Sequence, residues 1–467
     1  MTDQAHAHHD RQTSVSTSDL RDRVGSLMRQ AHDDLAALVA CKSVADPRQF
    51  PAAECAKAAQ LVIDKFSEVG LRDVRLEETP DGHPAVYGHI PAPDGAPTIL
   101  LYCHYDVQPP LDPTGTAWKT PAFELTEHDG RWYGRGAADC KGNIVMHLTA
   151  LRALGDEIPV GIKLIAEGSE ELGSGGMERF VPSRADLLRA DAIVVADTGN
   201  FEVGIPTLTT TLRGVANVIV TVSTLESAMH SGMFGGPAPD ALLALISMLA
   251  TLRDARGNTT IQGLESDARW QGVSYPPEQF RADAQVLDGV DLLGDGSVED
   301  MLWSRAAVTV LGIDCPPVVG SATAVSAQAR ARVSLRVPPG IDAQHAQDAL
   351  IAHLKAATPW HAKVEIEREV EGQPFVARTD GPAYAAMSLA LEQAFGRSIT
   401  TEGQGGSIPL CNVLRHTFPD AEIMLLGVEE PRCLIHAPNE SVDPGEIERM
   451  ALAEALFLSS YRAARRP

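Results

Sequence analysis

Hydrophobic residues near both ends of the chain form short uninterrupted runs, separated by stretches with helical spacing. Runs rich in β-branched residues and bounded by Pro, Gly or Asp are typical of strands buried on both faces. The predicted strands lie at residues 96–106, 160–168, 191–199 and 421–428. The predicted helices lie at residues 20–41, 52–70, 141–155 and 444–464. This alternation predicts an α/β fold with a mixed, mainly parallel sheet and helices on both faces.

The middle of the chain has a different pattern. Residues 211–224 and 329–339 alternate hydrophobic with polar positions, as strands with one solvent-facing side do. Helical stretches accompany them at 240–256 and 343–357. Because the last hydrophobic strand of the first unit comes only after residue 420, we expect an α+β domain inserted into that unit. The expected division is a disordered tail at 1–18, a first domain at 19–207 and 375–467, and an inserted domain at 208–374.

Composition narrows the class of protein. A chain of 467 residues suits two domains, and its formal net charge of -23 argues against nucleic acid and anionic membrane partners. No hydrophobic run reaches the length of a membrane span, and the first twenty residues lack the apolar core of a secretory signal. Seven scattered cysteines without a CxxC pair favour reduced thiols. We therefore expect a cytoplasmic protein.

Side chains that can bind a metal lie at the end of each predicted strand or just beyond it. The ends of parallel strands meet at one edge of an open α/β sheet, where ligands bind, so these side chains should converge. They are His104 and Asp106 at the end of the first strand, Glu170 and Glu171 at the end of the second, Asp197 at the end of the third, His436 one loop after the fourth, and Asp139 in a glycine-rich turn. Imidazole and carboxylate ligands suit zinc, and also manganese or cobalt.

The number of these groups fits a site for two metal ions. Two ions need about two terminal ligands each and one bridging carboxylate. That count is supplied by His104, Asp139, Glu171, Asp197 and His436. One glutamate of the adjacent pair is left over, and a free carboxylate beside a metal-bound water is what a general base requires. In an extended His104-Tyr105-Asp106 segment the first and third side chains share a face, so Asp106 can orient the histidine ring.

Simpler interpretations exist for single residues. Asp139 could merely cap the following helix, Asp197 could be a turn residue, and His436 could lie on the surface. Cys103 and Cys140 flank the predicted site, but no Cys–His pair is indicated, so buried inert thiols are favoured over a nucleophile. Only the convergence of several such groups at one edge favours the metal site.

Six segments resemble the signature blocks of one enzyme family. "CHYDVQP", "YGRGAADCKG", "EGSEELGSGG", "MHSGMFGG", "QGGSIP" and "HAPNES" occur in the family's order between about residues 25 and 460. This dinuclear zinc peptidase family holds the carnosinases and cytosolic dipeptidases, with acetylornithine deacetylase, succinyl-diaminopimelate desuccinylase and carboxypeptidase G as relatives. The resemblance implies a catalytic domain with two Zn²⁺ ions per subunit (Mn²⁺ or Co²⁺ being possible) and an inserted lid and dimerisation domain. "HYDVQP" and "HSGMFGG" favour the dipeptidase branch.

The resemblance also implies roles for the metal-site residues. His104, Asp139 and Asp197 match the ligands of one ion, and Asp139, Glu171 and His436 match those of the other, with Asp139 as the bridge. Glu170 matches the general base. The chain departs from many relatives at Cys140, where they carry a second aspartate. A constrained backbone is implied beside the bridging carboxylate, so we expect a cis peptide bond between Asp139 and Cys140.

Further residues are implied to contact the substrate. Arg336 matches the binder of the substrate's terminal carboxylate, for which a planar guanidinium is well suited. Gly405, Gly406 and Ser407 match a segment where the backbone approaches the substrate closely. His230 lies in the inserted domain, away from the predicted sheet edge. In the dipeptidase branch this histidine acts on the oxyanion in the partner's active site, so a homodimer is expected.

The expected function is hydrolysis of the amide bond of dipeptides by a metal-bridging water, with Glu170 as the general base. An alternative is an N-acyl-amino-acid deacylase of the aminoacylase or desuccinylase type, because the metal motifs do not separate the two substrate classes. A third possibility is a dimeric binding or scaffold protein that lost catalysis. Such a protein should lack a ligand or the base, and all of them are present here.

Overall fold

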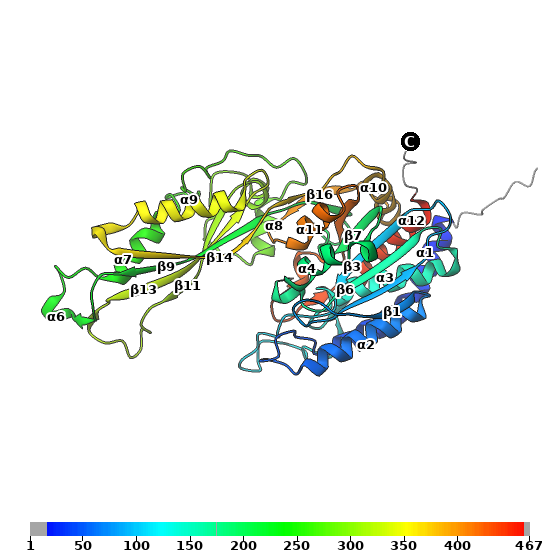
Figure 1. Cartoon of the computed structure of the whole chain (residues 1–467), viewed down its shortest axis with the longest axis horizontal. Helices are drawn as coiled ribbons and strands as arrows, with labels where there is room; N and C mark the ends of the chain where they lie inside the picture. Colours follow the sequence, from blue (N-terminus) through cyan, green and yellow to red (C-terminus); the bar gives the residue numbers. More distant parts are fainter. Residues whose placement is uncertain (1–15, 174, 462–467) are drawn as a thin grey trace, which may run out of the picture.

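The computed structural model describes residues 16–173 and 175–461. The chain forms a larger body that holds both ends of the described chain and an elongated extension built from its middle (Figure 1). Most of the expected tail lies outside the described residues. Helix α1 begins at Thr17, where the side chain of Ser16 accepts a hydrogen bond from the backbone N–H of Asp19 at 3.1 Å. Residues 17 and 18 of the expected tail therefore belong to a helix.

The larger body is built on a nine-stranded mixed sheet. Its strands, in spatial order, are β1 (Arg72–Glu77), β2 (Ala85–Ile90), β6 (Gly161–Glu167), β3 (Thr98–His104), β7 (Ala192–Ala196), β17 (Glu422–Leu426), β8 (Thr207–Leu212) and β15 (Phe375–Val376), and β16 (Thr400–Gln404) also pairs with β8. Strands β6, β3, β7 and β17 run parallel to one another at the centre of the sheet. All four are the predicted hydrophobic strands, and the expected fold class is confirmed.

Helices cover both faces of this sheet. One face carries α1 (Thr17–Val39), α2 (Ala52–Glu68), α3 (Lys141–Leu154), α10 (Pro382–Phe395) and α12 (Pro444–Ser460). The other face carries α4 (Gly175–Ser183), α5 (Ala185–Leu188) and α11 (Pro409–Thr417). The predicted helices all lie on the first face, where α1, α3 and α12 pack against one another.

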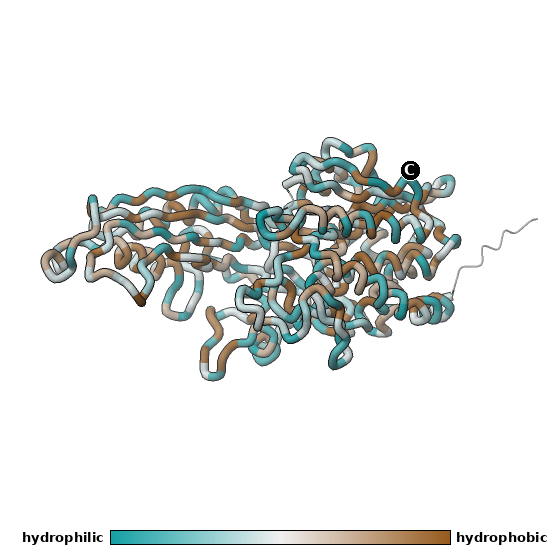
Figure 2. Tube along the Cα trace, turned by 90° about the horizontal axis from the view of Figure 1, so that it is seen from below, coloured by the Kyte–Doolittle hydropathy of each residue, from teal (hydrophilic) through white to brown (hydrophobic). Residues whose placement is uncertain are grey.

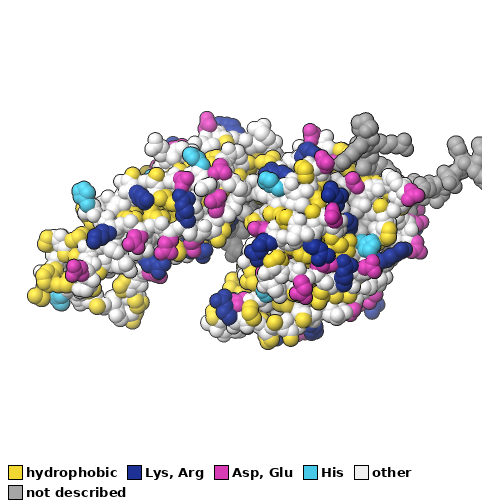
Figure 3. Space-filling model, viewed as in Figure 1, with side chains coloured by type: hydrophobic (Ala, Val, Ile, Leu, Met, Phe, Trp, Pro, Cys, Tyr) yellow, Lys and Arg dark blue, Asp and Glu magenta, His cyan; other side chains and the backbone are white. Residues whose placement is uncertain are grey.

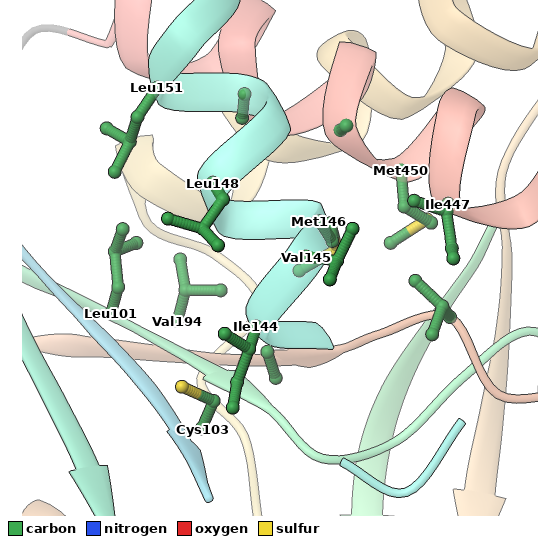
Figure 4. Close-up of a cluster of buried hydrophobic side chains, with 14 of the residues drawn as sticks. Leu101, Cys103, Ile144, Val145, Met146, Leu148, Leu151, Val194, Ile447 and Met450 are labelled. Carbon is green, nitrogen blue, oxygen red and sulfur yellow. The ribbon is translucent and has the colours of Figure 1, made fainter. Parts of the chain in front are cut away.

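Alternate residues of the central strands enter two separate hydrophobic cores. Leu101 and Cys103 of β3 pack under α3 and α12 together with Val194 of β7 (Figure 4). Leu100 and Tyr102, the residues between and beside them, belong to the core on the opposite face. Because both faces are buried, the strand needs hydrophobic residues at every position, which is why it reads as an uninterrupted run.

The extension is a four-stranded antiparallel sheet in the order β11 (Ala307–Asp314), β13 (Gln328–Val337), β9 (Gly214–Ser223) and β14 (Lys363–Gly372). Helices α7 (Ala241–Ala250) and α9 (Ala343–Ala356) cover one face. Hydrophobic and hydrophilic residues alternate along these strands (Figure 2), as expected for a sheet with one face in solvent. The chain enters this sheet at Gly214, after β8 of the large sheet, and leaves it at Gly372.

Smaller elements complete the fold. They are a three-stranded sheet of β18 (Ser441–Val442), β5 (Arg131–Tyr133) and β4 (Thr126–His128), a two-stranded ladder of β10 (Met229–His230) and β12 (Ala324–Val325), and the short helices α6 (Ser231–Phe234) and α8 (Pro277–Asp283). Among the described residues, no helix combines the length and apolar character needed to cross a membrane.

Candidate metal centre

Five predicted ligands meet at the carboxyl edge of the central strands. His104 is the last residue of β3, Asp197 directly follows β7, Glu171 lies in a short 3₁₀ helix after β6, and His436 lies in the loop after β17. Asp139 precedes α3 and stands between the two histidines. Its Oδ1 atom is 2.9 Å from His104 Nε2, and its Oδ2 atom is 2.9 Å from His436 Nε2. The fold therefore joins residues from five separate segments in one cluster.

The donor atoms form two sets that share Asp139. His104 Nε2 lies 3.1 Å from Asp197 Oδ1, and His436 Nε2 lies 3.3 Å from Glu171 Oε2. In the second set, the ligand atoms of Asp139, Glu171 and His436 all lie within 4.8 Å of one another. One imidazole with two carboxylates in each set is a donor chemistry that suits zinc, manganese or cobalt. The residues present therefore fit a pair of divalent cations with Asp139 between them.

Asp106 connects the end of β3 to the glutamate pair. Its carboxylate is fully buried and accepts the backbone N–H groups of Glu170 at 3.2 Å and Glu171 at 3.1 Å. Nδ1 of His104 lies 3.1 Å from the backbone carbonyl oxygen of Asp106 and 3.3 Å from its Oδ1 atom. Glu171 is held from its other side by Gln108, whose side-chain amide donates to Oε2 at 2.7 Å. These bonds fix the orientation of one histidine and the backbone position of both glutamates.

Burial and mutual repulsion shift the pKa values of these groups. Burial, followed by the nearby charge of Asp197, raises the pKa of Glu170 well above its usual value. Burial opposes ionisation of Asp139, but hydrogen bonds from His104 and His436 hold its pKa below its usual range. Hydrogen bonds to Asp139 and Glu171 raise the pKa of His436 to about 11. Several carboxylates packed together in a buried site favour a bound cation, which offsets their repulsion.

The loop that carries Asp139 is held by Glu440, a residue that sequence reasoning did not single out. Glu440 Oε1 accepts the backbone N–H groups of Ala138 and Asp139, both at 3.1 Å. Its Oε2 atom accepts the N–H of Gly136 at 3.0 Å and Nη1 of Arg135 at 2.6 Å. Glu440 and Arg135 are almost completely buried, so this carboxylate positions the turn before Asp139.

Glu429 is a second acid that the sequence interpretation missed. Its carboxylate lies within 4.8 Å of oxygen atoms of Asp139 and Asp197, and burial raises its pKa well above its usual value. The available signal was another adjacent glutamate pair, Glu429 and Glu430, which follows β17 as Glu170 and Glu171 follow β6.

The peptide bond between Asp139 and Cys140 is cis, as expected. Cys140 Sγ lies near His104 and Asp197 and donates to the carbonyl of Ala196 at 3.1 Å. Burial raises the pKa of this thiol to about 12, so Cys140 stays protonated at neutral pH and is a poor nucleophile.

The predicted substrate-binding residues lie where the two sheets adjoin. Arg336 of β13 pairs in register with Val215 of β9, which pairs on its other side with Gly372 of β14. Ser407 Oγ lies only 3.3 Å from the point that a Cβ atom on Gly372 would occupy. Gly406 follows β16 and lines a cavity that Glu429 also lines. Burial lowers the pKa of Arg336, and no acidic side chain of the described chain forms a salt bridge with it.

His230 is the predicted site residue that a single chain does not bring to the metal centre. It is exposed, pairs with Ala324 in the β10–β12 ladder, and its Nδ1 accepts the N–H of Gly232 at 3.1 Å. Helix α6, which begins at the next residue, lies at the far end of the extension (Figure 1).

Solved structures share this fold. Human carnosine dipeptidase 1 superimposes with a TM-score of 0.80 at 23% identity, covering 95% of this chain and 98% of that one. A metallo-carboxypeptidase from Sulfolobus solfataricus gives a TM-score of 0.76 at 24% identity, covering 92% and 98%. At these identities the likeness concerns the fold alone.

Curated relatives cover most of the chain. A cysteinylglycine-S-conjugate dipeptidase of Corynebacterium striatum is 46% identical over 411 residues, which are 87% of this chain and 90% of that protein. A Cys-Gly metallodipeptidase of Schizosaccharomyces pombe is 27% identical, covering 82% and 86%, and the beta-Ala-His dipeptidase of Homo sapiens is 26% identical, covering 85% and 83%. The model of peptidase family M20/M25/M40 matches residues 100–460. With its cluster of histidines and carboxylates at the edge of the sheet and a family match over residues 100–460, this chain belongs to peptidase family M20/M25/M40.

Proposed function

We propose that this protein is a metal-dependent dipeptidase. The observation that carries the proposal is the cluster in which Asp139 stands between His104 and His436, at 2.9 Å from each. Relatives of high coverage are named as dipeptidases, among them the Corynebacterium striatum protein at 46% identity. Their names support dipeptide hydrolysis over the deacylase alternative.

Two divalent ions are proposed, with zinc as the first choice and manganese or cobalt as alternatives. His104, Asp139 and Asp197 would hold one ion, and Asp139, Glu171 and His436 would hold the other. When bound, such ions polarise a carbonyl group and stabilise negative charge on its oxygen. The residues of the chain supply the remaining chemistry.

Glu170 is proposed as the general base. Its backbone is fixed by Asp106, and burial raises the pKa of its carboxyl group, which makes the carboxylate a stronger proton acceptor. Glu170 takes a proton from the attacking water and returns it to the nitrogen of the leaving amine. Asp106 keeps the ring of His104 in orientation through the contact at Nδ1.

The carboxyl end of the substrate is proposed to meet Arg336, Ser407 and the backbone at Gly406. The guanidinium of Arg336 has no acidic partner in the described chain and offers two parallel N–H groups to a carboxylate. This contact selects substrates whose scissile amide is followed by one residue with a free carboxylate, as in a dipeptide.

A homodimer is proposed as the active form. Hydrophobic side chains gather on the outer part of the extension (Figure 3). Exposed hydrophobic side chains of the extension include Met233, which is 75% exposed, Leu243 at 57% and Leu311 at 53%. Burying such side chains against a second copy is favourable. A dimer formed there would allow His230 to act in the partner's site, where a donor to the developing oxyanion is useful. The cytoplasmic location stays a prediction.

A substrate panel tests the proposed function. Purified protein supplied with Zn²⁺, Mn²⁺ or Co²⁺ is assayed on free dipeptides and on N-acetyl and N-succinyl amino acids with the same carboxyl-terminal residue. We expect a higher kcat/KM on the dipeptides. A preference for the N-acyl amino acids would favour the deacylase, and hydrolysis of neither class would contradict the proposal.

A further inference from the structure

A cavity of about 410 Å³ adjoins the metal centre. Glu429, which approaches Asp139 and Asp197, forms one side of it. The segment from Glu402 to Gly406 forms a second side. Tyr275 and Trp303, which belong to the inserted part of the chain, form an aromatic wall. The cavity therefore lies between Glu429, the end of β16 and the inserted segment.

Glu402 is a buried acid without a partner in this cavity. The residue is only 6% exposed, and within the described chain its carboxylate takes part in no hydrogen bond or salt bridge. Burial alone raises the pKa of its carboxyl group to about 8. Oε1 of Glu429 is likewise buried without a hydrogen-bond partner.

The third acid that lines the cavity, Glu430, is fully engaged. Its Oε1 atom forms a salt bridge with Arg131 at 2.5 Å, and its Oε2 atom accepts the backbone N–H of Arg432 at 2.8 Å. The difference shows that Glu402 is not placed to stabilise the fold through a local ion pair. A buried carboxylate without a partner costs free energy, and a bound cation offsets that cost.

The remaining lining indicates what kind of cation fits. Among the residues that the structure describes, no Lys, Arg or His lines the cavity. The rings of Tyr275 and Trp303 are stacked with their centroids 6.0 Å apart, and Leu302 and Ile435 add aliphatic surface. A positive group that carries an apolar side chain therefore suits the cavity better than an anion or a neutral polar group.

We propose that this cavity binds the amino-terminal residue of the substrate, with Glu402 pairing with an ammonium group and with Tyr275 and Trp303 contacting its side chain. The inference rests on the proposed dipeptidase function and adds the means by which a free dipeptide is distinguished from an N-acyl amino acid. An N-acyl group brings no ammonium to this position and leaves Glu402 unpaired. The ammonium group is either the α-amino group or that of a basic side chain.

The test compares alanyl-glycine, lysyl-glycine and propionyl-glycine as substrates of the wild-type protein, Glu402→Gln and Glu278→Gln. Propionyl-glycine has the shape of alanyl-glycine without the α-ammonium group. Glu278 is an exposed acid of α8, close to Tyr275 in sequence, so its replacement removes the same charge outside the cavity. Metal content is measured in each variant, so that a change at the metal centre is detected separately.

We expect the wild-type protein and Glu278→Gln to have a higher kcat/KM on the free dipeptides than on propionyl-glycine. In Glu402→Gln we expect the ratio of these kcat/KM values to fall by about tenfold or more, at unchanged metal content. A loss with both dipeptides identifies the α-ammonium group, and a loss with lysyl-glycine alone identifies the side-chain ammonium. If Glu402→Gln does not fold, Glu402→Asp, which withdraws the charge by one methylene, must show a smaller loss of the same kind.

An unchanged preference in Glu402→Gln, or an equal loss in Glu278→Gln, would overturn this inference. It would leave the dipeptidase proposal intact, because the wild-type protein still hydrolyses alanyl-glycine. Absence of hydrolysis of any dipeptide by the metal-loaded wild-type protein would instead contradict the proposed function.

Discussion

Replacing Glu440 by glutamine removes the charge that holds the turn before Asp139. The carboxylate of Glu440 is 0% exposed, and its two oxygens together accept three backbone N–H groups and one guanidinium N–H. Glutamine has nearly the same shape, but its amide nitrogen does not accept hydrogen bonds. Whichever way the amide points, two donors lose their acceptor, and Arg135, which is 1% exposed, loses its counter-charge.

Two separate estimates of the loss agree. A hydrogen bond to a charged group contributes about 1.5–3 kcal/mol, so two lost bonds correspond to roughly 3–6 kcal/mol. Removing one partner of a buried ion pair costs about 3–5 kcal/mol. We therefore expect Glu440→Gln to lower the free energy of unfolding by about 3–5 kcal/mol. Because the loosened turn carries the bridging residue, we also expect metal affinity to fall by about 10–100-fold.

Urea denaturation of the metal-free protein measures the first effect, and competition with a metal-binding dye measures the second. Glu127→Gln is the control. Glu127 is an exposed residue of β4, and β4 belongs to the same three-stranded sheet as β18, the strand that begins directly after Glu440. Surface substitutions usually change the free energy of unfolding by no more than about 0.5 kcal/mol. If Glu440→Gln lowered this free energy by less than about 1 kcal/mol, and by no more than the control does, the reasoning would be refuted.

Three further predictions follow from the site. Glu170→Gln should keep the metal content measured by mass spectrometry but lower kcat by about 10²–10⁴, whereas Glu171→Gln should lower the metal content; exchanged phenotypes would invert the two assignments. His230→Ala should lower kcat by about 10²–10³-fold at unchanged metal content. Mixing His230→Ala subunits with Glu170→Gln subunits should restore activity if the histidine acts across the interface. No recovery after subunit exchange would contradict this role. Burial raises the pKa of Glu402 from 4.5 to about 8, so between these pH values the folded state holds a proton that the unfolded state has lost. The free energy of unfolding of the wild-type protein, relative to that of Glu402→Gln, should therefore fall as pH rises from about 4.5 to about 8. Parallel pH profiles of unfolding for the two proteins would contradict the buried, unpaired state of this group.

The central strands could be predicted closely because every position on them is buried. The run at 96–106 became β3 at Thr98–His104, with alternate residues in two cores. Helical spacing was less reliable at 240–256, where α7 ends at Ala250. The chain turns back there, and Arg253 forms an isolated β-bridge with Thr259. This local pairing overrides the helical preference of the residues that follow Ala250.

Most candidate metal-site residues could be proposed from sequence because they lie at or just beyond the ends of predicted strands, and the fold class then places them at one edge. Asp139 was singled out by its glycine-rich turn. Glu440 could not, since its role depends on contacts with a turn about 300 residues earlier in the chain, such as the bond from the N–H of Asp139. Glu402 is buried in the wall of a cavity that it shares with Trp303, a residue of the inserted part of the chain that packs against Gly403. Neither contact leaves a local pattern in the sequence.

The most direct test of the account is the activity of metal-free protein on a dipeptide. Protein treated with a chelator and verified as metal-free by mass spectrometry is assayed on alanyl-glycine, before and after addition of Zn²⁺, Mn²⁺ or Co²⁺. The account predicts no hydrolysis without metal, recovery with at least one of these ions, and no recovery in Asp139→Asn, which lacks the bridging charge. Full activity in the metal-free protein would contradict it.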